Sequence, residues 1–170
     1  MSRHEITLTV NGRRHTAQVE ARVTLVDFLR DHLRLTGTHT GCEHGVCGAC
    51  SILLNGKPVR SCLIFAVQAA DADIVTVEGL APDPETLSIL QDSFWETHGL
   101  QCGFCTPGIL IAARALLAQN LSPTEEQIRD AIGGNLCRCT GYKPIVDAIK
   151  LASMRMRQSN EAGGKYAGAE

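Results

Sequence analysis

The sequence predicts an α+β protein made of two small domains, a mixed β-sheet domain over residues 1–78 and a four-helix bundle over residues 79–157. Three observations support this prediction. The first half joins short β-rich segments through Asn-Gly turns, which are typical of hairpins. The second half has apolar residues at helical spacing, with capping residues and prolines at helix starts. Between the halves, Gly79, Pro82 and Pro84 indicate a linker.

The first half begins with a hairpin followed by a helix. The predicted elements are a strand over residues 5–10, a turn at Asn11-Gly12, a strand over residues 15–19 and a helix over residues 25–35 capped by Thr24. A second hairpin follows, with strands over residues 51–54 and 58–62 around Asn55-Gly56, then a helical piece over residues 63–69 and a strand over residues 73–77. This order is compatible with a small sheet wrapped on one helix, the β-grasp fold of ferredoxin type.

The second half predicts helices alone. They cover residues 85–97, 106–119 (opened by Thr106-Pro107), 124–132 (opened by a capping box from Ser122) and 145–157 (opened by Pro144). Together they predict a small bundle. Residues 158–170 are polar and rich in Gly and Ala, so we expect a tail that is disordered or lies on a partner.

Composition and charge exclude several classes of protein. A net charge of −2 and an aromatic content of 4% argue against a nucleic-acid partner. The start of the chain has no secretory signal, and the least charged long stretch, residues 97–113, is too short and too interrupted by glycine and proline to span a bilayer. We therefore expect a cytoplasmic protein, where eight cysteines favour metal or cluster ligation over disulfides.

The first four cysteines have the spacing of plant-type [2Fe–2S] ferredoxins. Cys42, Cys47 and Cys50 follow the pattern C-x4-C-x2-C, and Cys62 comes after eleven further residues. The loop Gly41–Cys50 also contains three glycines, which let backbone amides approach the sulfurs closely. We predict one [2Fe–2S] cluster on these four thiolates.

The other four cysteines lie at helix boundaries of the second half. Cys102 and Cys105 precede one predicted helix, and Cys137 and Cys139 precede another. Helix N-termini carry partial positive charge and free amides, so they favour thiolates and an anionic cluster. We expect the two loops to meet at one end of the bundle and to hold a second cluster.

Three other interpretations of the cysteines remain open from spacing. Two structural zinc ions could occupy the two sets, although a C-x1-C pair has poor geometry for zinc. Buried inert thiols are a weaker alternative, because core cysteines do not gather in Gly-rich loops. His44 lies inside the first loop, but no second histidine shares the paired motif that a Rieske centre needs, so we interpret it as a loop residue.

With both sets in view, the chain resembles the small iron–sulfur subunit of the molybdenum hydroxylases, the family of xanthine dehydrogenase, carbon monoxide dehydrogenase and aldehyde oxidoreductase. The matching motifs are GCEHGVCGAC (Gly41–Cys50), Ser61-Cys62, QCGFCTPG (Gln101–Gly108) and GNLCRCTGY (Gly134–Tyr142). All eight ligand positions agree, and the resemblance covers about residues 4–155.

The resemblance implies a role for each domain. The N-terminal cluster would lie nearer an FAD subunit and the helical-domain cluster nearer molybdopterin on a large subunit, in a heterotrimer or a dimer of heterotrimers. Gln101 and Cys139 would lie against the pterin. Without the resemblance, Gln101 is better interpreted as an amide that stabilises its loop.

The residues themselves agree with an electron-transfer role. The chain has no G-x-G-x-x-G after a strand, no Walker loop and no Ser/His/Asp arrangement. We therefore expect it to carry electrons between partners, while the substrate binds to the molybdenum subunit. Two alternatives are a self-standing two-cluster ferredoxin carrier and a zinc-stabilised interaction module.

Overall fold

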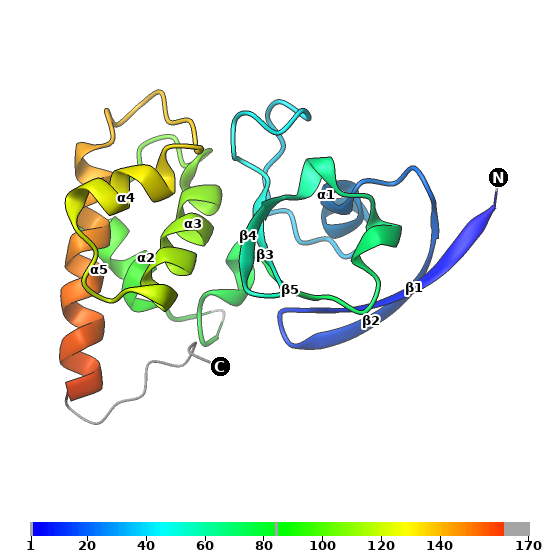
Figure 1. Ribbon diagram of the computed structural model, residues 1–170, viewed down its shortest axis with the longest axis horizontal. Helices are drawn as coiled ribbons and strands as arrows, with labels where there is room; N and C mark the ends of the chain where they lie inside the picture. Colours follow the sequence, from blue (N-terminus) through cyan, green and yellow to red (C-terminus); the bar gives the residue numbers. More distant parts are fainter. Residues whose placement is uncertain (1, 84, 162–170) are drawn as a thin grey trace.

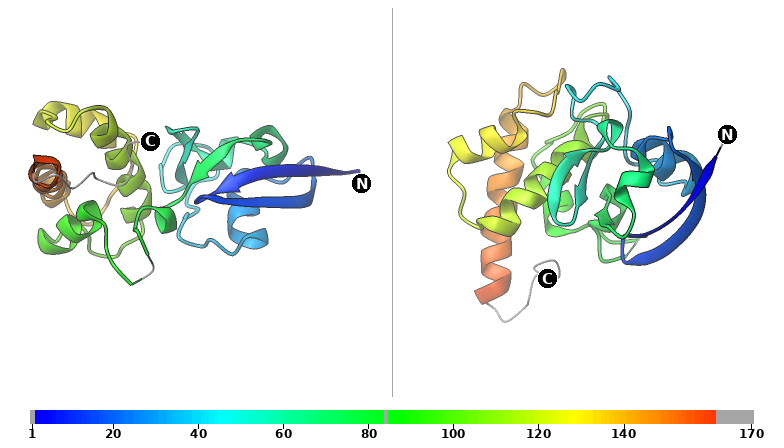
Figure 2. Two further views of the ribbon diagram at one scale, coloured as in Figure 1. Left: turned by 90° about the horizontal axis from the view of Figure 1, so that it is seen from below. Right: turned by 45° about the vertical axis from the view of Figure 1, so that its right-hand side comes forward.

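The structure is a computed structural model that describes residues 2–83 and 85–161. It consists of a β-sheet domain and a helical domain that lie side by side (Figure 1). The two further views show the same arrangement from other sides (Figure 2). Each half has its own apolar core, one built around Leu8, Phe28 and Ile52 and the other around Phe94 and Ile149.

The sheet is mixed, as predicted. Its strands are β1 (Arg3–Val10), β2 (Arg13–Glu20), β3 (Ser51–Leu54), β4 (Lys57–Arg60) and β5 (Asp73–Val75), in the order β2-β1-β5-β3-β4. β5 runs parallel to β1 and antiparallel to β3. Both Asn-Gly turns have positive φ at both residues, 50° and 75° at Asn11-Gly12 and 49° and 76° at Asn55-Gly56. That is the type I′ geometry that their sequence predicts.

The helix under the sheet is shorter than the predicted span of residues 25–35. Its N-cap is confirmed, because the Thr24 hydroxyl accepts a hydrogen bond from the Asp27 amide at 3.2 Å. The α-helical part, α1 (Leu25–Asp27), continues as a π-helical turn over Phe28–His32. Arg34 has φ 60°, a left-handed conformation that ends the helix.

Two predicted strands are too long. The strand predicted over residues 58–62 ends at Arg60, because the chain turns there and the Ser61 carbonyl accepts from the Ile64 amide. Cys62 therefore lies in a 3₁₀ turn, Ser61–Leu63. The strand predicted over residues 73–77 ends at Val75, and the Thr76 amide bonds instead to the side chain of Asn11. The helical piece predicted over residues 63–69 is a 3₁₀ turn, Ala66–Ala69, and a further 3₁₀ turn spans Val77–Gly79.

The second half is helical, as predicted. Its helices are α2 (Ile89–Glu96), α3 (Thr106–Gln119), α4 (Glu125–Ile132) and α5 (Lys143–Glu161). Pro84 and residues 162–170, including most of the expected tail, lie outside the described residues. Residues 158–161 belong to α5, so the predicted end of the last helix at residue 157 is too early.

Three predicted helix starts need correction. α2 begins at Ile89 and not at residue 85, because Ser88 and Gln91 form a capping box. The box of α4 pairs Thr124 with Gln127, so Ser122 is not its N-cap. α5 begins at Lys143, two residues before the predicted start at residue 145. α3 spans residues 106–119 as predicted, but its N-cap position is Cys105 and not Thr106.

The two domains meet where α3 packs against β3. Leu53 of β3 forms a small apolar cluster with Ile111 and Ala115 of α3. This contact brings the loop before β3 close to the loop before α3, and both loops contain cysteines. In the described part of the chain, no helix is both long and apolar enough to cross a bilayer.

Candidate iron–sulfur cluster sites

The first three cysteines lie on the loop that precedes β3. This loop curls back on itself, and Glu43, Gly45 and Gly48 have φ values of 59°, 84° and 75°. The curl points backbone amides at sulfur, and the Cys47 amide lies 3.4 Å from Cys42 Sγ. A Cβ atom at Gly41 would lie 3.1 Å from Cys47 Sγ, so this glycine leaves the thiol its space.

Burial divides the first set into two pairs. Cys42 and Cys47 are half-buried, whereas Cys50 and Cys62 are buried and pack with Val26. Hydrogen bonds from the amides of Cys47 and His44 lower the pKa of the Cys42 thiol to about 6. Burial raises the pKa of Cys62 to about 11, and its side chain contacts that of Cys50. The half-buried Cys42 thus favours the thiolate, whereas the buried Cys62 needs a cation nearby to become ionised.

The second set comes together from two loops, as expected. Cys102 and Cys105 lie before α3, and Cys137 and Cys139 lie between α4 and α5. The sulfurs of Cys102 and Cys139 are 3.5 Å apart, and the side chains of Cys105 and Cys137 also interact. The Tyr142 hydroxyl positions the second loop, since it accepts from the Cys137 amide at 2.8 Å and donates to the Asn135 carbonyl at 3.1 Å.

The second set is more open to solvent than the first. Cys102 and Cys139 are exposed, Cys137 is half-buried and Cys105 is buried. The Phe104 amide lowers the pKa of Cys102 by donating to its sulfur, whereas burial raises the pKa of Cys105 to about 12. The exposed pair forms the edge of this site.

The donor chemistry of both sets fits a two-iron cluster. Each set offers four thiols, the ligands that iron–sulfur clusters require, and amides already point at the sulfurs of Cys42 and Cys102. Side-chain contacts within the sets are made in pairs, and each iron of a [2Fe–2S] cluster takes two protein ligands. Among residues 2–83 and 85–161, no three His, Cys, Asp or Glu side chains form a group that would hold a single metal ion. The ligand assignment itself stays a prediction.

Gln101 and Cys139 both lie at the exposed edge of the second cysteine set, as the QCG motif suggests. Gln101 precedes Cys102, whose sulfur contacts that of Cys139, and both Gln101 and Cys139 are exposed. Within the described residues no hydrogen bond is found for the Gln101 side chain, so a loop-stabilising role has no support there. The predicted contact with a pterin remains a prediction.

Sequence reasoning missed the residues that join the two sites. The Leu136 amide donates to the Cys47 carbonyl at 2.9 Å. Asn135 is 1% exposed, and its side-chain amide donates to the Gly48 carbonyl at 2.9 Å. A Cβ atom on Gly108 would lie 2.3 Å from the Gly48 carbonyl oxygen, so glycine is required for this approach. No local pattern pairs positions 87 residues apart, so this contact has no signal in a single sequence.

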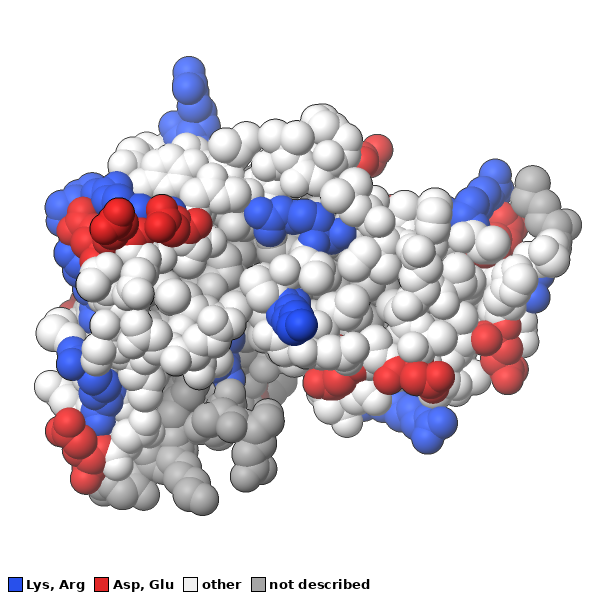
Figure 3. Space-filling model, viewed as in Figure 1, with Lys and Arg blue, Asp and Glu red and all other residues white. Residues whose placement is uncertain are grey.

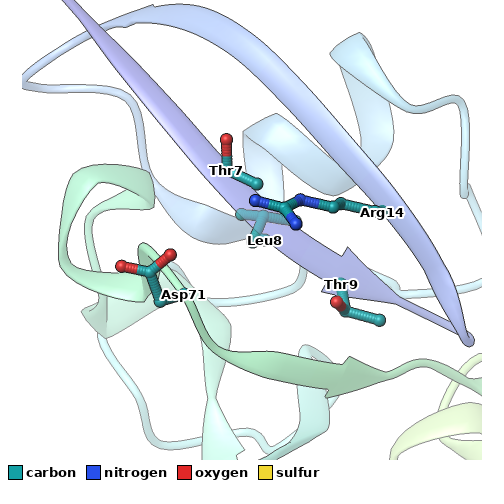
Figure 4. Close-up of a pocket in the computed structure, with 5 residues that line it drawn as sticks. All are labelled: Thr7, Leu8, Thr9, Arg14 and Asp71. Carbon is teal, nitrogen blue, oxygen red and sulfur yellow. The ribbon is translucent and has the colours of Figure 1, made fainter.

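A shallow pocket lies away from these sites. It is lined by Thr7, Leu8, Thr9, Arg14 and Asp71, on β1, β2 and the turn before β5 (Figure 4). No cysteine borders it, so it takes no part in either cluster site.

Comparison with known proteins agrees with the two sites. Residues 8–81 match the family model of the 2Fe-2S iron-sulfur cluster binding domain, and residues 76–150 match that of the [2Fe-2S] binding domain. The fold and the two matches define a two-cluster iron–sulfur protein, with the ferredoxin-like and helical domains that the sequence predicts.

Relatives identify the family more closely. Over 156 residues the chain is 56% identical to the caffeine dehydrogenase subunit gamma of Pseudomonas sp. (strain CBB1), covering 90% of this chain and 93% of that protein. It is 55% identical over 158 residues to the nicotine 6-hydroxylase small subunit of Paenarthrobacter nicotinovorans, covering 93% and 94%. The structure of quinoline 2-oxidoreductase from Pseudomonas putida 86 superposes with a TM-score of 0.89 at 49% identity, covering 93% of this chain and 98% of that chain. The chain belongs to the small [2Fe–2S] subunits of the molybdenum hydroxylases, as its motifs indicate.

Proposed function

We propose that this chain passes electrons, one at a time, from a molybdopterin centre towards FAD, with both of those cofactors held by partner subunits. The observation that carries the proposal is the hydrogen bond from the Leu136 amide to the Cys47 carbonyl. Leu136 precedes Cys137, so this one bond joins a residue of the first cysteine set to the neighbour of a residue of the second.

The chain's own residues provide the framework for this role. Bound [2Fe–2S] clusters supply one-electron carriage through iron that alternates between its two oxidation states. Cys42, Cys47, Cys50 and Cys62 would hold one cluster, and Cys102, Cys105, Cys137 and Cys139 the other. The domains that hold them are residues 1–78 and 79–157 in this proposal. The chain turns over no substrate by itself.

Exposed apolar side chains beside both sites support docking to partner subunits. Val46, Leu63 and Phe65 lie beside the first set, with exposed fractions of 59%, 60% and 46%, and Phe104 and Leu136 lie beside the second, with 49% and 58%. These are five of the eight large apolar side chains that the described residues expose. In the view of Figure 3 the upper edge of the molecule, which carries the cysteine loops, is mostly uncharged between one basic side chain that projects from its top and one acidic group at its right. Apolar surface of this kind marks protein–protein contacts.

The exposed pair of the second set supports one orientation within the complex. We place the N-terminal cluster nearer the FAD subunit, and Gln101 and Cys139 against molybdopterin on the large subunit. The assembly is a cytoplasmic heterotrimer or a dimer of heterotrimers. Open exposure of Cys102, Cys139 and Gln101 supports this orientation, because a partner's cofactor can reach them.

Elemental analysis of the tagged chain, purified gently from its native host, tests the proposal. Two clusters require about four irons per chain, and a molybdenum partner adds roughly one molybdenum per four irons. Iron without molybdenum would favour the self-standing ferredoxin carrier. Zinc with little iron would contradict the redox role.

A further inference from the structure

A single arginine lies between the two cysteine sets. Arg60 is the last residue of β4, two positions before Cys62, and its side chain is half-buried. Nη1 donates to Ser51 Oγ and Nη2 donates to the Gly134 carbonyl, each at 2.6 Å. Ser51 follows Cys50, and Gly134 lies three residues before Cys137. The guanidinium thus reaches from the loop of one set to the loop of the other.

The groups that hold Arg60 do not balance its charge. A hydroxyl and a carbonyl are neutral, and no ion pair with Asp or Glu is found for Arg60 in the described part of the chain. A half-buried cation without a counter-ion is unfavourable unless an anion lies nearby. The groups near its two partners that become anionic when a cluster binds are Cys50, next to Ser51, and Cys137, three residues after Gly134.

The surrounding contacts hold the guanidinium in this place. The Ser51 hydroxyl is buried, donates to the Gly48 carbonyl at 2.6 Å, and accepts from both Arg60 and Asn135. A Cβ atom on Gly134 would lie 2.6 Å from Arg60 Nη2, so the loop is glycine where the arginine passes. Since both of its contacts are made by a planar fork, the charge has little freedom to move away.

We propose that Arg60 is a positioning residue whose charge is shared by the two clusters and raises the reduction potential of both. The inference rests on the proposed electron-transfer function. A cluster on four thiolates is anionic, and reduction makes it more so. A fixed cation nearby therefore stabilises the reduced form more than the oxidised form. Because the same cation bonds to residues of both cysteine loops, we expect one substitution to change both potentials together.

The test uses the multisubunit complex purified through a tag on this chain, with cluster potentials measured by redox titration followed by electron paramagnetic resonance. Arg60→Gln keeps hydrogen-bond donors but removes the charge, and we expect both clusters to shift to more negative potentials. Arg60→Lys keeps the charge, and we expect potentials close to those of the wild type. Arg3→Gln, at the far end of β1, is the matched control and should change neither potential.

Each outcome decides the inference. Unchanged potentials in Arg60→Gln, or a shift of one cluster only, would overturn it. If Arg60→Gln loses the clusters, Arg60→Lys becomes the deciding variant. Retention of both clusters with lysine supports a role of the charge. Loss of the clusters in both variants would contradict the inference, because the hydrogen-bonding geometry of arginine, and not its charge, would then be what the sites need. Failure of the proposed function would look different, because the wild-type preparation itself would then lack molybdenum, or would contain zinc with little iron and give no cluster signals.

Discussion

Both cysteine sets bring four thiols together, but they do so with different local structures. In the first, three thiols lie on a single loop of ten residues, and the loop's own amides point at sulfur. In the second, two thiols lie on the loop before α3 and two on the loop after α4. The Tyr142 side chain positions the backbone of that second loop. The first site is therefore determined mostly by local chain geometry, and the second by the packing of helices.

The difference also affects exposure. The first set has two buried thiols and no fully exposed one, whereas the second has one buried and two exposed thiols. A cluster on the first set would therefore be covered by more protein than one on the second set. This asymmetry fits an electron path that enters at the helical domain from a partner's cofactor.

The largest predicted effect is the loss of one cluster while the other is retained. Cys47→Ser should remove the N-terminal cluster and spare the other, and Cys137→Ser should do the reverse, since each removes one ligand of one set. Iron content should fall by about half in each variant, with one of two electron paramagnetic resonance signals lost. If either substitution abolished both signals in a folded protein, the assignment of two separate sites would be wrong.

The second prediction concerns the contact between the sites. Gly48 and Gly12 both have φ 75°, but a Cβ atom on Gly48 would lie 2.4 Å from the Gly134 carbonyl oxygen, whereas nothing lies within 4 Å of one on Gly12. We expect Gly12→Ala to cost about 1 kcal/mol of unfolding free energy. Gly48→Ala should cost about 2–5 kcal/mol, because it also forces the two loops apart.

Chemical denaturation of the two variants measures this difference. Gly12→Ala is the matched control, since it carries the same backbone strain without the clash. Equal losses in the two variants would mean that the loops separate at little cost, and the close approach of the sites would then be unimportant for stability.

Local signals in the sequence were sufficient for much of this molecule. Cysteine spacing, both Asn-Gly turns and four helices were predictable because each depends on residues close together in the chain. The predicted starts of α2 and α4 were wrong for the same reason. More than one Ser or Thr residue precedes each helix, and the local pattern does not show which of them is the N-cap. The capping box with Gln91 or Gln127 decides which one is used.

The bridge between the sites could not be predicted. Arg60 and Asn135 look like ordinary polar residues until α3 packs on β3 and brings the two loops together. Their partners are the backbone carbonyls of Gly48 and Gly134 and the hydroxyl of Ser51, which form no local sequence pattern with them. Domain packing therefore determines this part of the site, and local propensity says nothing about it.

A smaller effect should be confined to the second site. Tyr142→Phe removes the hydroxyl that bonds the Cys137 amide and the Asn135 carbonyl. Leaving these partly buried groups without a partner should cost about 1–3 kcal/mol. Thermal bleaching should then release the helical-domain cluster at a lower temperature, with the N-terminal cluster as an internal control. A matching loss of the N-terminal cluster would show that the loops do not respond independently.

The smallest predicted effect tests how helix packing supports the second site. Glu125 of α4 pairs with Lys150 of α5 at 2.6 Å and with Arg129 at 2.7 Å. Hydrogen bonds from Lys150 and Arg129 hold the pKa of Glu125 at about 2, below its ordinary value of 4.5. Glu125→Gln should lower the midpoint of thermal unfolding only slightly, because solvent screens exposed ion pairs.

The pH dependence isolates this ion pair from the general effect of charge. A lowered pKa in the folded state means that the stabilisation is fully present above about pH 4.5 and is lost as the pH falls towards 2. Glu126→Gln removes the same charge one position along, where no ion pair is found among the described residues, so both variants change the helix dipole interaction alike. Urea unfolding followed by circular dichroism should therefore show Glu125→Gln less stable than Glu126→Gln at pH 7, with the gap closing in acid. A gap that persists below pH 2 would mean that packing of the side chain, and not its charge, joins α4 to α5.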